Sequence, residues 1–137
     1  MADREHFELL MRDVDAWNKW RAENPKVKPD LTFAVMRGAD LTLANLAHAQ
    51  LSEADLVLAN LRGADLRHAD LSGANLVGAR LMGVDLDFAN IRAADLSTAE
   101  DLTDEQLRHT HGDSETKLPD ELHAPQNWLK KGRTAAH

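Results

Sequence analysis

Few residues in this chain carry side chains suited to catalysis, and most of those keep a fixed spacing. Ser52, Ser72 and Ser97 are separated by multiples of five residues, and the sequence places no base beside them. The glycines follow the same five-residue spacing and open no helix, so they form no phosphate-binding loop. His109 and His111 lie two residues apart, which supplies fewer ligands than a zinc site needs. We therefore predict no enzyme activity, no catalytic residue, no cofactor and no metal site.

The element that positions these residues is a five-residue repeat between residues 29 and 98. Its central position is Leu, Met or Ile in fourteen consecutive units, and the residue two positions earlier is alanine in twelve of them. The central side chains are therefore the predicted structural core. The predicted core positions are Leu41, Leu46, Leu51, Leu56, Leu61, Leu66, Leu71, Leu76, Leu81, Leu86, Ile91 and Leu96.

A period of five fits neither regular secondary structure. On a straight α-helix the leucines would wind around the whole cylinder, and in a flat strand they would alternate between the two faces. Both patterns leave the leucines without a common core. The conflict disappears if the chain turns a corner once per pentapeptide, so that the alanine and the leucine always point to one axis. Burying twelve leucines at roughly 1.5–3 kcal/mol each then outweighs the helix propensity of Ala and Leu.

The other repeat positions favour such corners. The residue before the central one is Asp or Asn in eleven of the fourteen units, and the second residue after it is glycine in five. Asp and Asn form local hydrogen bonds in turns, and glycine accepts left-handed backbone angles. These positions are therefore predicted to face water at the turns.

Three successive units, Ala-Asp-Leu-Arg-His, Ala-Asp-Leu-Ser-Gly and Ala-Asn-Leu-Val-Gly, occupy residues 64–78. In these units the chain resembles the pentapeptide-repeat family. The resemblance implies an all-β solenoid, a right-handed quadrilateral β-helix with four pentapeptides per coil. Fourteen units then give about 3.5 coils, on the order of 17 Å long at a strand spacing of about 4.8 Å.

A solenoid exposes unpaired backbone at its ends, so both ends need caps. Residues 1–28 are the predicted N-terminal helical cap, because residues 4–22 carry apolar side chains at the spacing of one amphipathic helix. Residues 29–98 form the predicted β-helix. Residues 99–137 form the predicted helical and irregular C-terminal cap and tail. A capping box at Thr103–Gln106 is predicted to open a short helix, and Leu118, Leu122 and Trp128 are predicted to fold back over the last coil. The end of the chain is predicted to be frayed.

The segments that border the repeats carry a looser resemblance. Residues 16–25 (AWNKWRAENP) and 118–128 (LPDELHAPQNW) are similar to flanking stretches of some bacterial pentapeptide-repeat proteins. This resemblance implies a complete natural protein.

Composition limits the compartment and the partners. The chain has 137 residues, no cysteine and a net charge of −7. No apolar run reaches membrane length and no secretion signal is visible, which favours a cytoplasmic protein. Because nucleic acid and anionic membranes bind basic surfaces, we expect direct binding to neither.

Stacking coils of twenty residues would place every twentieth residue in one column. Val57 and Val77, with Leu58 beside them, then form an exposed apolar strip that Met82 extends on the next face. Such clusters can mark contact sites, which makes these four residues the candidate interaction face. Valine is also common on extended faces without any contact, and the sequence leaves both interpretations open.

Two other columns contain titratable residues. His48, His68 and Phe88 are stacked, which brings two imidazoles to about 4.8 Å, but without a third ligand they are interpreted as solvated turn residues. Asp alternates with Asn in the columns of Asp55, Asn75 and Asp95, among others. This alternation relieves repulsion between coils, so the carboxylates are interpreted as structural.

The function predicted from the sequence is that of a non-catalytic protein-interaction or structural module with an unidentified protein partner. The alternative is a DNA mimic that inhibits DNA gyrase or another DNA-binding enzyme, as the resemblance to larger family members implies. Residues 29–98 carry nine acidic residues and five arginines, a net charge of −4. A duplex of that length would carry about ten charges, so the charge favours the interaction module. A homodimer through an end cap is an open alternative.

Overall fold

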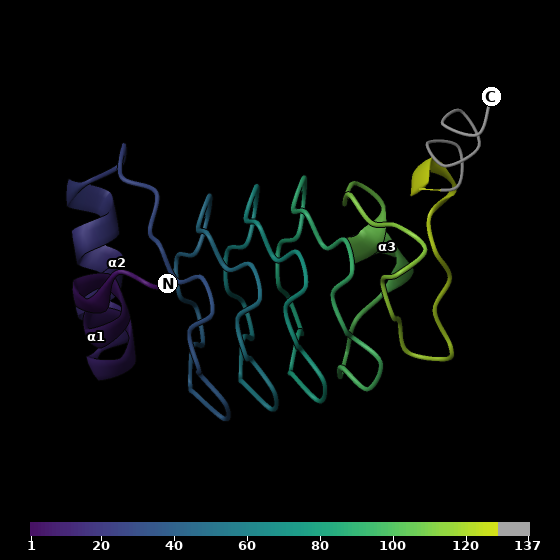
Figure 1. The fold of residues 1–137 in the computed structure, drawn as a ribbon, viewed down its shortest axis with the longest axis horizontal. Helices are drawn as coiled ribbons and strands as arrows, with labels where there is room; N and C mark the ends of the chain where they lie inside the picture. The colour runs from purple at the N-terminus through teal and green to yellow at the C-terminus, as the bar shows by residue number, and fades with distance from the viewer. Residues whose placement is uncertain (129–137) are drawn as a thin grey trace.

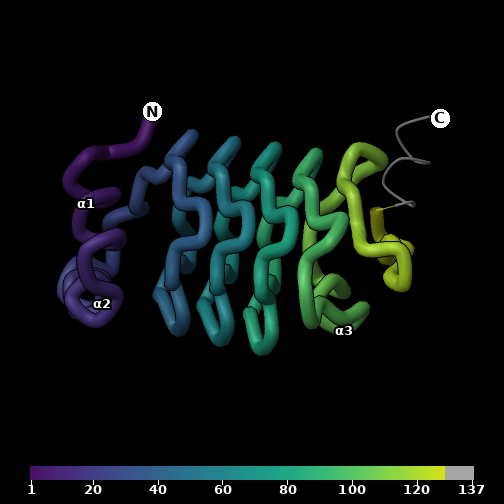
Figure 2. Tube along the Cα trace, turned by 90° about the horizontal axis from the view of Figure 1, so that it is seen from below, coloured from purple at the N-terminus to yellow at the C-terminus, as the bar shows by residue number. Residues whose placement is uncertain are grey.

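The computed structural model describes residues 1–128, and the predicted frayed end lies outside the described residues. The chain begins with two helices, α1 (Arg4–Arg12) and α2 (Val14–Glu23), and a third helix, α3 (Asp104–Leu107), follows the repeats. Stacked coils occupy the space between them, with α1 and α2 at one end and α3 at the other (Figure 1, Figure 2).

The coils are joined by parallel bridges between residues that lie twenty positions apart. The bridges run without a gap in register from Asp30 with Gln50 to Arg80 with Glu100, one bridge for every five residues. Each bridge involves a single residue because the chain turns again within its unit, so the repeats form a solenoid without long strands. The right hand of the coil and the number of coils remain predictions.

Each pentapeptide contains a turn in which the alanine N–H donates to the carbonyl of the preceding core residue, as Ala59 does to Leu56 at 3.0 Å. At every turn from Phe33 to Ala93 the third residue of the turn has a positive φ, and it is a glycine at only five of these turns. At Phe33, Leu43, His48, Glu53, Leu58, His68, Phe88 and Ala93 a side chain is held in this left-handed conformation. That conformation costs an L-residue roughly 1–2 kcal/mol, and burial of the core outweighs the cost.

The interior of the solenoid is filled by the central side chains of the repeat. All twelve predicted core residues, Leu41 to Leu96 in steps of five, are at most 2 % exposed. The alanines two residues earlier are buried with them. A continuous column of leucine and alanine therefore closes the solenoid axis to water.

The Asp and Asn residues of the repeat each brace the turn that follows. All eleven accept a hydrogen bond from the backbone N–H two residues ahead, as Asn75 does from Val77 at 3.1 Å. This local bond explains why both residue types serve at the position, since each supplies the same acceptor oxygen.

The prediction of one continuous helix over residues 4–22 is wrong. The backbone of Asp13 is extended, with φ −162°, and separates α1 from α2. Its side chain accepts hydrogen bonds from the N–H groups of Asp15 and Ala16, so it caps α2. An Asp at this position satisfies the free amides of a new helix and thereby favours a break.

Helix α2 takes the place of a missing coil at the N-terminal end. Trp17 Nε1 and Arg21 Nη1 both donate to the carbonyl of Asn45, at 2.8 and 3.2 Å, and Arg21 Nη2 donates to Ala47. Asn18 accepts from the N–H of Asn45 and donates to the carbonyl of Leu43. These side chains replace the backbone partners that an earlier coil would supply.

At the other end the ladder continues past residue 98. Asn90 is bridged to His111 and Asp95 to Lys117, so the spacing has grown to 21 and 22 residues. The inserted residues accommodate α3, whose N-cap Thr103 and N3 residue Gln106 form a reciprocal capping box. Trp128 is buried against this last turn and donates from Nε1 to the carbonyl of Thr110 at 3.1 Å.

Candidate interaction surface

One side of the solenoid collects exposed apolar side chains from neighbouring coils. We call it the Asn60 face: the column of Asp40, Asn60 and Arg80 together with the two rows of turns that border it. Of the four predicted interaction residues, Leu58 is 66 % exposed and Met82 is 52 % exposed. Val57 and Val77 are half-buried. Val57, Leu58 and Val77 lie along one border and Met82 along the other.

The structure adds Leu43 to this face. Leu43 is 66 % exposed and lies on the same border as Met82. Its side chain covers Gly63 of the next coil, because a Cβ on that glycine would come within 2.7 Å of Leu43 Cδ2. Leu58 covers Gly78 in the same way, at 2.6 Å. The signal was in the sequence, since each exposed leucine is followed twenty residues later by a glycine.

Charges of both signs lie between the two apolar borders. Asp40 accepts hydrogen bonds from the hydroxyl and the N–H of Thr42, and these bonds lower the pKa of its carboxyl. Arg80 is exposed and reaches Glu100 of the next coil at 4.0 Å. The face therefore presents separated negative, neutral and positive side chains to a partner.

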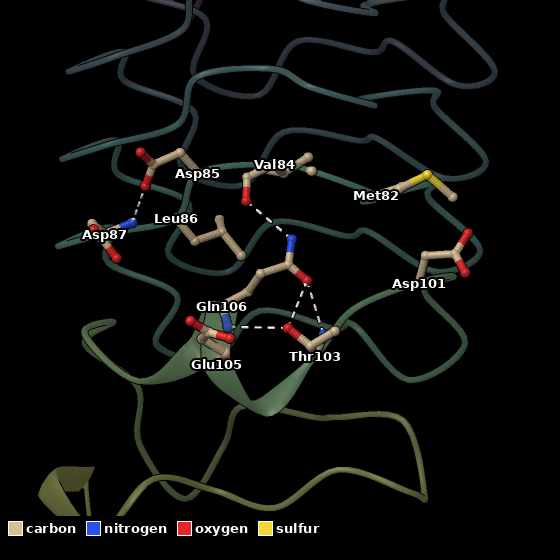
Figure 3. Close-up of a pocket in the computed structure, with 10 residues that line it drawn as sticks. Met82, Val84, Asp85, Leu86, Asp87, Asp101, Thr103, Glu105 and Gln106 are labelled. Carbon is tan, nitrogen blue, oxygen red and sulfur yellow. Dashed lines mark hydrogen bonds between the residues drawn. The ribbon is translucent and has the colours of Figure 1, made fainter.

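A cleft of about 450 Å³ opens beside Met82, between the coil of residues 82–87 and α3 (Figure 3). Four carboxylates line it, those of Asp85, Asp87, Asp101 and Glu105. In Figure 3, Gln106 points from α3 into the end of the solenoid, where its Nε2 donates to the carbonyls of Leu81 and Val84. This anchoring fixes α3 against the coil and gives the cleft a rigid wall.

A ladder of aromatic rings runs along another row of turns. His48 and His68 are stacked with their ring centroids 4.8 Å apart, Phe88 follows at 5.1 Å, and His109 follows at 6.1 Å. The pKa of His48 is lowered, first by burial and then by the charges of His68, Lys28 and Arg21, while Asp65 acts in the opposite direction. Sequence reasoning missed His109 because the insertion before α3 shifts it out of the twenty-residue spacing.

A second apolar hollow, of about 410 Å³, lies between the N-terminal residues and the first coil. Phe7, Phe33 and Val35 line it, and the last two are more than 60 % exposed. Unlike the Asn60 face, this hollow depends on the first two residues of the chain, Met1 and Ala2, for one of its walls.

The described residues hold no arrangement typical of catalysis. Between residues 1 and 128 no three His, Cys, Asp or Glu side chains gather where they would hold a metal ion. Ser72 donates to Asp70 at 2.7 Å within its own turn, which makes it a turn brace. In the same part of the chain, no helix is both long and apolar enough to cross a membrane.

Comparisons with known proteins agree with this geometry. A family model described as pentapeptide repeats matches eight copies, over residues 30–63 and 59–97. No curated protein matches the chain. A solved pentapeptide repeat protein from the cyanobacterium Cyanothece 51142, Rfr23, is 36 % identical, with a TM-score of 0.51 over 68 % of this chain and 67 % of that one.

Two other solved structures are similar at 27 % identity. One is a pentapeptide repeat protein of the Arabidopsis thaliana thylakoid lumen, with a TM-score of 0.54 over 66 % of this chain and 61 % of that one. The other is HetL from Nostoc sp. strain PCC 7120, a pentapeptide repeat protein involved in regulating heterocyst differentiation, with a TM-score of 0.56. The match to HetL covers 71 % of this chain and 45 % of that one, so this chain spans less than half of HetL.

Proposed function

Because this chain belongs to the pentapeptide-repeat family, we propose that it is a non-catalytic protein-interaction module that binds its partner through the Asn60 face. The observation that carries the proposal is the exposure of Leu43, Leu58 and Met82, each at least half exposed, on turns of adjacent coils. Exposed apolar clusters bordered by charges are typical of contact sites. The backbone ladder holds these side chains in place, so binding costs little ordering entropy.

A regulatory relative supports this proposal. HetL is a pentapeptide repeat protein with a role in regulating differentiation. Such a role is consistent with a module that acts by contact. As part of the same proposal we place this chain in the bacterial cytoplasm, which its lack of cysteine favours.

The charge distribution does not favour mimicry of DNA. Arginines interrupt the acidic columns: Arg37 pairs with Asp55, and Arg67 pairs with Asp65 and Asp85. Duplex DNA instead presents an uninterrupted row of negative charges. We therefore expect no inhibition of gyrase-catalysed supercoiling by this protein at high molar excess.

The experiment that tests the interaction module is capture on immobilised protein. Wild type, Leu58→Asp and the control Phe33→Asp are exposed to a bacterial lysate and, separately, to the purified chain at up to about 1 mM, and the bound protein is measured at equilibrium without washing. Phe33 is a matched control because it is 62 % exposed, has the same left-handed turn conformation and lies off the Asn60 face. Asp tolerates that conformation, so both variants should fold, and their melting temperatures check this.

We expect wild type and Phe33→Asp to retain the same protein and Leu58→Asp to lose it. Equal retention by all three baits, or retention by none from either source, would contradict the proposal.

A further inference from the structure

We propose that the occupant of the Asn60 face is a second copy of this chain, packed antiparallel about a twofold axis at the level of Asn60. This inference rests on the proposed function, because it names the partner of the same face. A twofold interface brings one surface patch against itself, so the patch must be complementary to its own reversed image. The Asn60 face meets this condition in its charges and in its shape.

Within the Asn60 face, Asp40, Asn60 and Arg80 are complementary to their own reversed order; Glu100, bridged to Arg80 one coil further on, lies outside this set. Asp40, Asn60 and Arg80 are successive bridged residues, so Asp40 and Arg80 lie one coil to either side of Asn60. In an antiparallel pair Asp40 of each copy faces Arg80 of the other, which forms two ion pairs. Asn60 then faces Asn60, and an amide can both donate to and accept from its own copy. A parallel pair would oppose like charges instead.

The apolar borders are complementary in the same arrangement. The twofold axis lies in the plane of the interface and runs perpendicular to the long axis of the solenoid. Such an axis keeps each apolar border opposite the same border of the second copy. Leu58 therefore meets Leu58 close to the axis. Leu43, one coil away from the axis, meets the border at Met82 and Gly83. There is room there, since a Cβ built on Gly83 would have only the backbone of Gly63 nearby, at 3.8 Å.

One residue opposes the pairing and gives it a distinctive signature. Arg62 follows Asn60 by two residues, is exposed, and lies on the border near the axis. It would therefore approach its own copy, and two like charges at an interface weaken association. Removing this charge should tighten the dimer, which a purely structural surface arginine would not do.

The ends of the solenoid are less suited to self-association than this side. At the N-terminal end Trp17, Asn18 and Arg21 already bond to the free backbone groups of Leu43, Asn45 and Ala47. At the other end Trp128 covers the last turn. A second copy that docked on either end would have to displace these contacts.

The size of the face sets the strength of the dimer. The three coils that carry Asp40, Asn60 and Arg80 span only about 10 Å along the solenoid, at roughly 4.8 Å per coil. An interface of that length buries less than the ~800 Å² per partner that stable dimers bury. We therefore expect a weak dimer with a dissociation constant between about 10 μM and 1 mM. Such a dimer forms and dissociates with concentration.

Analytical ultracentrifugation of the full chain over that concentration range tests the proposal. The wild type should shift from monomer to dimer as concentration rises, and Phe33→Asp should behave identically. Leu58→Asp, Asp40→Arg and Arg80→Asp should each weaken the dimer at least tenfold. The double variant with Asp40→Arg and Arg80→Asp restores both ion pairs in exchanged positions, so it should recover the dimer. Arg62→Gln should dimerise more tightly than wild type.

Each other outcome overturns the second copy as the occupant. A monomer at every concentration removes it, and if Leu58→Asp still loses a captured lysate protein, the interaction module survives with a different partner. A dimer that none of these substitutions changes lies elsewhere on the molecule. A double variant as weak as the two single variants shows that Asp40 and Arg80 do not face each other.

Discussion

The interior and the turns of this solenoid differ in how strictly the sequence repeats. Every interior position carries Leu, Met or Ile with a small residue beside it, and these side chains are buried. A single row of turns carries Phe33, Glu53, Gly73 and Ala93, although all four have a positive φ. The fold thus depends on the interior and tolerates varied residues at the turns, even against local backbone preference. The variation within this solenoid is therefore found at the turns.

The largest expected effect is the loss of folding when a leucine of the interior, and not one of a turn, is replaced by Asp. Leu66→Asp buries a charge in the closed axis, where it finds no partner, and should cost more than about 4 kcal/mol, enough to prevent folding. Leu58→Asp at a turn should leave the protein folded. Thermal unfolding followed by circular dichroism compares the two variants. A cooperative unfolding transition of Leu66→Asp near the wild-type melting temperature would contradict a closed leucine core.

The N-terminal end extends the comparison of interior and turns, because side chains of α2 there take the hydrogen-bonding role that the backbone of a coil has elsewhere. Trp17 is fully buried and donates to Asn45, so Trp17→Ala should lower the free energy of unfolding by about 3–5 kcal/mol. Trp17→Phe keeps most of the packing but loses the hydrogen bond, and should cost less. Urea denaturation measures both, and equal losses would show that packing contributes little at this end.

A smaller effect is expected from the turn braces. Asn75→Ala removes the bond from the N–H of Val77 and should cost about 1 kcal/mol. Gln50→Ala is the control, because Gln50 occupies the equivalent repeat position but its side chain lacks such a bond among the described residues. Chemical denaturation of both variants checks the difference. If the two variants lose the same stability, the Asp and Asn residues are not braces.

The smallest effect concerns the aromatic ladder. Burial and nearby positive charges lower the pKa of His48 in the folded state, so the unfolded chain binds the proton more readily. This residue should leave stability unchanged above pH about 6.5 and reduce it as pH falls below that value, until the folded form is protonated too. The decline should be shallower in His48→Asn, measured by urea denaturation from pH 8 to pH 5. A wild-type profile with no decline, or one identical to that of the variant, would show that His48 is not perturbed.

The five-residue period predicts the solenoid because burial of leucine dominates the energetics, and the coils follow from it. The capping box at Thr103 and Gln106 could also be predicted from the sequence, because its residues lie only three positions apart. Asp13 was not recognised as a helix break, because apolar spacing continues across it. Leu43 was missed although the glycine that it covers, Gly63, lies twenty residues later in the sequence. His109 was missed because the insertion before α3 shifts it out of the twenty-residue spacing.

The most direct test of the Asn60 face is amide chemical-shift mapping of the wild-type protein as its concentration rises. We expect shifts to gather at Leu43, Leu58, Asn60, Arg80 and Met82 and to be absent from His48 and His68 on the ring ladder. Shifts that gather at the ladder or at the ends of the solenoid, or no shifts at all, would contradict self-association through the Asn60 face.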